Sequence, residues 1–206
     1  MGISRWPVRG ARRASALLAL GFVLGAAGCG SRQQGVLDEA AAPPAPKELK
    51  PEEAFLVEVW GPSPPDTTVT FLSSQPRTVV LRHGPPDNTV FAEVAFPANA
   101  LAPAEGADSV RLQIRPLPGI YGVDLLADGK LAEGTRLTFK YPVHFSAPAA
   151  SRDKYPTELE FERALVIARQ PEPGASYRTL PTTRPASDNL STELPELGRY
   201  LLLAPR

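Results

Sequence analysis

Few residues in this chain combine a type and a spacing that support chemistry, and the two histidines are the first to consider. His83 lies four residues before Asp87, a spacing that allows a metal-ligand pair or a base oriented by a carboxylate. The turn Gly84-Pro85-Pro86 lies between them, so we favour the alternative of a solvated loop histidine. His144 falls on the polar face of a predicted strand, where we also expect solvent exposure.

Motifs for catalysis and metal binding are absent from the sequence. There is no Gly-x-Ser-x-Gly, His-Glu-x-x-His, Cys-x-x-Cys or Gly-x-x-x-x-Gly-Lys-Ser/Thr pattern. Aspartates at predicted turns offer oxygen ligands for calcium, but no Asp-x-Asp-x-Asp-Gly loop is present, and turn formation accounts for them. These residues are Asp66, Asp87, Asp108, Asp128 and Asp153. We therefore predict no enzyme activity, no catalytic residue, no cofactor and no metal site.

Trp60 is followed by Gly61-Pro62 and has two interpretations. It could be a stacking platform for a sugar or a peptide. We favour a core or edge aromatic, because large aromatic side chains dominate the energetics of cores as well as interfaces.

The N-terminus has the pattern of an export signal. Residues 1–13 contain four arginines and no acidic residue, and residues 14–27 are uncharged and rich in Leu, Ala and Gly. The apolar run of about fourteen residues is too short for a spanning helix, which needs about 20. Residues 1–28 are therefore predicted to be a signal segment.

Small residues lead from Leu24 into Cys29, the only cysteine of the chain, as Leu24-Gly25-Ala26-Ala27-Gly28-Cys29. This run resembles the lipobox of bacterial lipoproteins, and the resemblance implies a lipid, including palmitate, on Cys29 and a membrane anchor in the cell envelope. Gly30 follows the cysteine, at the position where an Asp would resemble the inner-membrane retention mark of Gram-negative lipoproteins. The absence of this Asp implies the outer membrane if the host is Gram-negative. The alternative is an ordinary signal peptide with an unmodified Cys29.

Charge and composition change after the signal segment. The chain has 22 basic and 22 acidic residues; without the four signal arginines, 18 basic residues remain and the net charge is about −4. This balance offers no electrostatic attraction for nucleic acid. Residues 29–54 begin with the lipidated cysteine and are rich in Ala, Glu, Lys and Pro. We predict that 30–54 form an extended tether that is dispensable for folding.

Residues 55–206 are predicted to form one all-β domain, an antiparallel β-sandwich. The clearest strands are 109–115 and 136–145, where apolar and polar residues alternate; Pro142 places the second at an edge or bulge. Asp128-Gly129 is predicted to be a hairpin turn, and 157–168 is the one segment that could be helical. Weaker strands are 55–60, 67–72, 77–82, 89–96, 164–169, 177–180, 190–194 and 199–204.

Three stretches carry a family resemblance. Residues 94–101, Val-Ala-Phe-Pro-Ala-Asn-Ala-Leu, resemble the strand and turn of ZU5-type sandwich domains, with Asn99 where that family has glycine. Residues 121–145 are similar to the second half of that family, and 197–203 resemble the closing strand of exported sandwiches. The resemblance implies an immunoglobulin-like or ZU5-like fold and a protein-interaction module without catalysis.

The sequence as a whole predicts a membrane-anchored envelope lipoprotein that presents a non-enzymatic binding or structural module. Its expected partners are the membrane, through Cys29, and an envelope protein or glycan. A carbohydrate-binding module and a hydrolase are the alternatives. The first requires exposed, coplanar aromatic side chains, and the second requires His83 or His144 in a cleft with a serine and a carboxylate.

Overall fold

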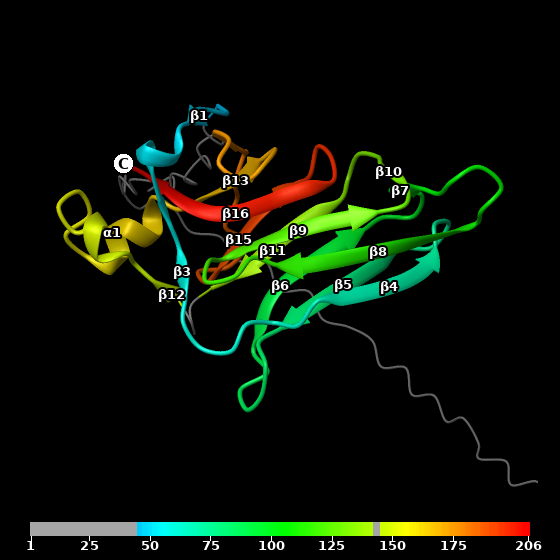
Figure 1. Cartoon of the computed structure of the whole chain (residues 1–206), viewed down its shortest axis with the longest axis horizontal. Helices are drawn as coiled ribbons and strands as arrows, with labels where there is room; N and C mark the ends of the chain where they lie inside the picture. The colour runs from blue at the N-terminus through cyan, green and yellow to red at the C-terminus, as the bar shows by residue number, and fades with distance from the viewer. Residues whose placement is uncertain (1–44, 142–144) are drawn as a thin grey trace, which may run out of the picture. The chain divides into compact units, whose positions relative to one another are not determined.

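The structure is a computed structural model that describes residues 45–141 and 145–206. These residues form an antiparallel β-sandwich, which confirms the predicted fold class (Figure 1). Its core is continuous between the two large sheets, with Leu112 and Tyr200 from one sheet and Phe91 and Phe139 from the other all buried.

The larger sheet has eight strands. Along its path lie β1 (Glu48–Leu49), β14 (Tyr177–Thr179), β13 (Val166–Gln170), β16 (Gly198–Pro205), β9 (Gly122–Ala127), β8 (Ser109–Pro116) and β4 (Thr67–Leu72), and β2 (Ala54–Leu56) also pairs with β16.

The second sheet has four strands, in the order β15 (Asn189–Glu193), β11 (Arg136–Lys140), β6 (Val90–Phe96) and β5 (Arg77–Arg82). Two small ladders complete the strands: β10 (Lys130–Leu131) with β7 (Leu101–Ala102), and β12 (Phe145–Ser146) with β3 (Glu58–Val59). The helices are short: η1 (Pro51–Glu53), η2 (Ala149–Ser151) and α1 (Glu158–Arg163).

The two clearest predicted strands are present as β8 and β11. Val110, Leu112 and Ile114 are buried on β8, and Leu137 and Phe139 on β11. The second prediction was too long, because β11 ends at Lys140 and the chain resumes as β12, which pairs with β3 outside the four-stranded sheet. Residues 142–144, with Pro142 and His144, lie outside the described residues.

The prediction of a hairpin at Asp128-Gly129 was wrong. β9 pairs with β8 and β16 in the large sheet, whereas β10 leaves that sheet to pair with β7. Gly129 lies against the chain at β7, where a Cβ would stand 2.2 Å from the Ala102 carbonyl oxygen. The glycine is therefore needed for close approach of two backbones.

The segment predicted as helical divides into a helix and a strand. Thr157 caps α1: its Oγ1 accepts from the Glu160 amide at 3.2 Å, and Glu160 Oε2 accepts from the Thr157 amide at 3.0 Å. This reciprocal pair is a capping box. The helix buries Phe161 and ends at Arg163, and β13 begins three residues later at Val166.

The end of the predicted tether is part of the domain, so the boundary at residue 55 was wrong. β1 pairs with β14, and the Lys47 amide donates to Thr179 Oγ1 at 2.7 Å. A second apolar cluster, separate from the main core, contains Ala54, Ala168, Tyr177, Leu201 and Leu203, with Leu49 packed against it. The ordered segment therefore covers apolar surface that the sandwich would otherwise expose to water.

Candidate functional site

The candidate site is a groove at the flank of the sandwich, and it exists because the two sheets differ in width. In the large sheet, Tyr200 pairs with Arg169, and Arg169 pairs with Arg178. Paired residues in antiparallel strands point to the same face. Tyr200 is in the core. Arg169 and Arg178 therefore extend the core-facing side of the sheet beyond the cover of the four-stranded sheet.

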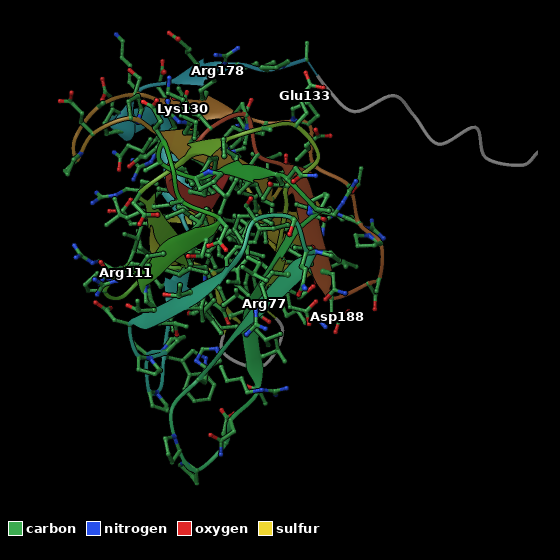
Figure 2. All side chains as sticks on the ribbon, turned by 90° about the vertical axis from the view of Figure 1, so that its right-hand side faces the viewer. Arg77, Arg111, Lys130, Glu133, Arg178 and Asp188 are labelled. Atoms are coloured by element: carbon green, nitrogen blue, oxygen red, sulfur yellow. The ribbon has the colours of Figure 1, made fainter. Side chains whose placement is uncertain are left out.

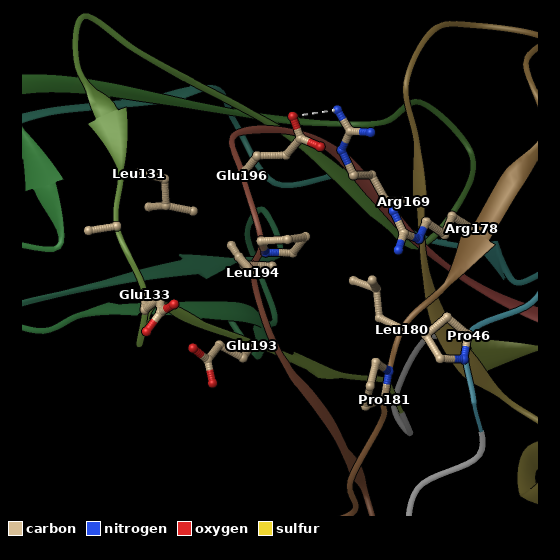
Figure 3. Close-up of a pocket in the computed structure, with 12 residues that line it drawn as sticks. Pro46, Leu131, Glu133, Arg169, Arg178, Leu180, Pro181, Glu193, Leu194 and Glu196 are labelled. Carbon is tan, nitrogen blue, oxygen red and sulfur yellow. Dashed lines mark ion pairs between the residues drawn. The ribbon is translucent and has the colours of Figure 1, made fainter.

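The groove encloses about 440 Å³ and is lined by apolar and charged side chains (Figure 3). This is within the ~300–1,000 Å³ range of ligand pockets. The apolar lining consists of Pro46, Leu131, Ala132, Leu180, Leu194, Pro181 and Pro195. The charged lining consists of Glu133, Arg169, Arg178, Glu193 and Glu196.

Arg169 forms an ion pair within the groove, and 19% of its side chain is exposed. Its Nη2 lies 3.2 Å from Glu196 Oε2. Its Nε is buried and has no hydrogen-bond partner among the described residues. Arg178, its cross-strand neighbour, is exposed, and like charges directly opposite each other are unfavourable. This wall of the groove therefore carries two cations beside one carboxylate.

Tyr200 lies opposite Arg169 on the neighbouring strand β16. Its hydroxyl donates to the Glu196 carbonyl oxygen, which fixes the turn that carries the Glu196 carboxylate. Burial raises the pKa of Tyr200 to about 12, although the charge of Arg169 lowers that pKa in part. The phenol is therefore neutral at physiological pH, and it does not neutralise Arg169.

The opposite wall of the groove is acidic. Glu193 Oε1 accepts from the Gly134 amide at 2.8 Å, which holds this carboxylate at the end of β15. Gly134 has a φ of 91°, a backbone conformation that favours glycine, so the turn that bonds to Glu193 depends on it. Glu133 precedes this turn and is exposed. Figure 2 shows Glu133 and Arg178 toward the same end of the domain, with Arg77 and Arg111 away from it.

A second polar cluster, in which only Tyr141 is buried, joins α1 to the sandwich. Tyr141 donates to Glu162 Oε1 at 2.6 Å and accepts from Arg184 Nη1 at 3.0 Å, while Arg184 Nη2 donates to the Glu162 carbonyl oxygen. Burial and the bond to Glu162 raise the pKa of Tyr141 to about 12. Every group in this cluster bonds to another member or to backbone, so we assign it to fixing the C-terminal end of α1.

His83 is buried, so the prediction of a solvated loop histidine was wrong. It is 2% exposed, and its Nδ1 lies 3.0 Å from the Pro62 carbonyl oxygen. Its ring contacts Phe91 and Tyr121 edge-on, with centroids 5.3 and 6.3 Å away. Asp87 Oδ1 accepts from the Thr89 amide at 2.6 Å. These contacts explain His83 as a packed side chain that links the loop at Pro62 to the core.

The other residues singled out in the sequence lie apart from the groove. Cys29 and His144 lie outside the described residues. Trp60 is 59% exposed, which excludes the core position predicted for it and leaves the edge position. Asp128 Oδ1 accepts from the Arg111 amide at 2.9 Å, and Asp66 pairs with Arg115 at 3.8 Å. Among residues 45–141 and 145–206, no three His, Cys, Asp or Glu side chains group together as metal ligands.

Comparisons with protein-family models, with curated proteins and with solved structures found no match to this chain. Within the described part of the chain, none of the helices has the length and apolar character needed to span a bilayer. A function for the folded domain is therefore inferred from the chemistry of the groove.

Proposed function

We propose that this protein is a lipid-anchored envelope lipoprotein whose β-sandwich is a non-enzymatic binding module. The observation that carries the binding role is the groove beside β13, β14 and β15, where charged side chains from several elements surround an apolar floor. A concave apolar surface with a few convergent polar groups is the usual form of a ligand site. Its lining offers no serine, cysteine, histidine or lysine as a nucleophile.

Two further features support the proposal. The sequence run Leu24 to Cys29 supplies the lipid anchor, which we place on the outer membrane if the host is Gram-negative. In the stretch that resembles ZU5 domains, Asn99 has a φ of 63°. This left-handed conformation favours glycine and is tolerated by asparagine. The replacement of the family's glycine by Asn99 is thus compatible with the same turn, and a ZU5-like interaction module stays our proposal for the domain.

A carbohydrate-binding module is the second candidate, and the exposure of Trp60 favours it. An exposed indole ring could stack on a sugar. Carbohydrate recognition would be stronger with a second coplanar ring, and the other large hydrophobic residues exposed in the described part of the chain are aliphatic. The groove therefore ranks above Trp60 as the binding surface.

The anchor is tested by Cys29→Ala in a bacterial host. Without the thiol no lipid can be attached, and two or more acyl chains are what makes membrane attachment stable. We expect the variant to leave the membrane fraction or to accumulate as uncleaved precursor, measured by fractionation and mass spectrometry. Mature Cys29→Ala protein in the membrane fraction would refute the anchor.

The binding role is tested by placing a photoreactive amino acid at Ala132, in the groove, of the full chain in cells. The matched control is Thr68 on β4, which is exposed at the opposite edge of the large sheet. We expect a reproducible adduct from position 132 that is missing from position 68. Equal adducts from both positions, or none from position 132, would contradict a binding role for the groove.

A further inference from the structure

The charges of the groove are separated by apolar surface. Figure 3 shows Arg169 and Arg178 on one side, Glu133 and Glu193 on the other, and Leu194 between them. If the arginines and glutamates of the groove only stabilised the fold, we would expect the two sides to form ion pairs with each other. Here the ion pair defined within the groove joins Arg169 to Glu196, and Glu193 bonds to a backbone amide instead.

The cationic side has the capacity to bind a further anion. Glu196, which is 59% exposed, pairs with Arg169, whereas Arg178 is exposed and forms no ion pair in the described structure, although Glu48 lies opposite it on β1. A guanidinium binds a carboxylate through paired N–H donors, so a ligand carboxylate placed between Arg169 and Arg178 would offset the repulsion of these two neighbouring like charges.

The acidic side has the opposite capacity. Glu133 is exposed and has no ion pair in the described structure, and Glu193 is held with one of its oxygens bonded to the Gly134 amide. Two carboxylates at one end of an apolar floor suit an ammonium group, which donates three hydrogen bonds.

We propose that the groove binds a short peptide with free ends and apolar side chains. This inference rests on the proposed function of the groove as a binding site. The peptide's terminal carboxylate lies against Arg178 and Arg169, its terminal ammonium group against Glu133 and Glu193, and its side chains on Leu131, Pro181 and Pro195. Leu131 is half-buried and the two prolines are exposed, so these side chains present the apolar surface of the groove above the buried Leu180 and Leu194.

Calorimetric titration of the full-length protein in detergent tests this proposal. The probes are peptides of alternating leucine and proline, two to five residues long, with free ends, together with N-acetylated and C-amidated forms. We expect one length to bind best, and we expect capping either end to weaken binding by about tenfold or more, because each cap removes charge-assisted hydrogen bonds.

Two variants assign the ends of the peptide. Arg178→Gln should weaken binding of the free-acid peptide about tenfold and leave the C-amidated form unchanged. Glu133→Gln should weaken binding of the free amine and leave the N-acetylated form unchanged. Arg77→Gln, which changes an exposed arginine on β5, is the matched control and should bind like the wild type.

The outcomes separate the two proposals. If capping the peptide ends leaves the affinity unchanged, or if both groove variants bind the peptides like the wild type, the assignment of the ends is wrong and the inference fails. If none of the peptides binds while position 132 still gives its adduct in cells, the inference fails and the proposed binding role stands. If position 132 also gives no adduct, both fail.

Discussion

A chain that begins at Glu53 should melt at a markedly lower temperature than one that begins at Gly30. The truncation removes β1 and the Lys47 bond to Thr179, and it uncovers Tyr177, Leu201 and Leu203. Lost apolar burial and hydrogen bonds of this size cost about 2–4 kcal/mol. For a domain of this length, the expected fall in melting temperature is about 5–15 °C.

Two comparisons isolate the cause of this destabilisation. A chain that begins at Ala45 keeps β1 and should melt at the same temperature as the chain that begins at Gly30. This result is expected if residues from 45 onward account for the stabilisation by the tether. In the full chain, Leu49→Ser should lower the melting temperature, whereas the exposed neighbour Glu48→Ser should not. If the chain from Glu53 melts unchanged, β1 does not stabilise the sandwich.

The sequence predicted those strands whose signal is local. β8 alternates apolar and polar residues, and its neighbours along the chain are enough to recognise it. β9 was not predicted, because Gly122-Val-Asp-Leu-Leu-Ala gives a weak alternation, and its pairing with β16 joins residues more than seventy positions apart. The tether was extended to residue 54 for the same reason: its composition is polar, and only the pairing with β14 orders its last residues.

The groove was beyond prediction from sequence. Arg169 and Arg178 belong to predicted strands, but a sequence pattern does not say that β13 and β14 extend past the edge of the smaller sheet. His83 was misassigned because its partner carbonyl, at Pro62, lies 21 residues earlier in the chain. A glycine-proline turn after a histidine suggested exposure, whereas tertiary contacts decided its burial.

The largest effect of a single substitution is expected for Phe139→Asp, which should prevent folding. Phe139 is fully buried on β11 and packs edge-on against Phe91 at 5.9 Å. Losing the aromatic ring costs about 3–5 kcal/mol. An unpaired carboxylate in the core adds several more, which together reach the ~5–15 kcal/mol stability of a whole domain. Circular dichroism should show no cooperative unfolding transition.

Substitutions at Arg136 and His83 show whether this effect follows burial or the β11 region in general. Arg136→Ala, on the exposed side of β11, should change the stability by no more than about 0.5 kcal/mol. His83→Ala should lower the stability by about 2–4 kcal/mol, because it leaves a cavity beside Phe91 and removes the shorter of the two hydrogen bonds to the Pro62 carbonyl oxygen. Thermal unfolding of the three variants gives the order directly. A stable Phe139→Asp variant would mean that the faces of β11 are reversed. A His83→Ala variant with the stability of the wild type would mean that His83 is a solvent-exposed loop residue.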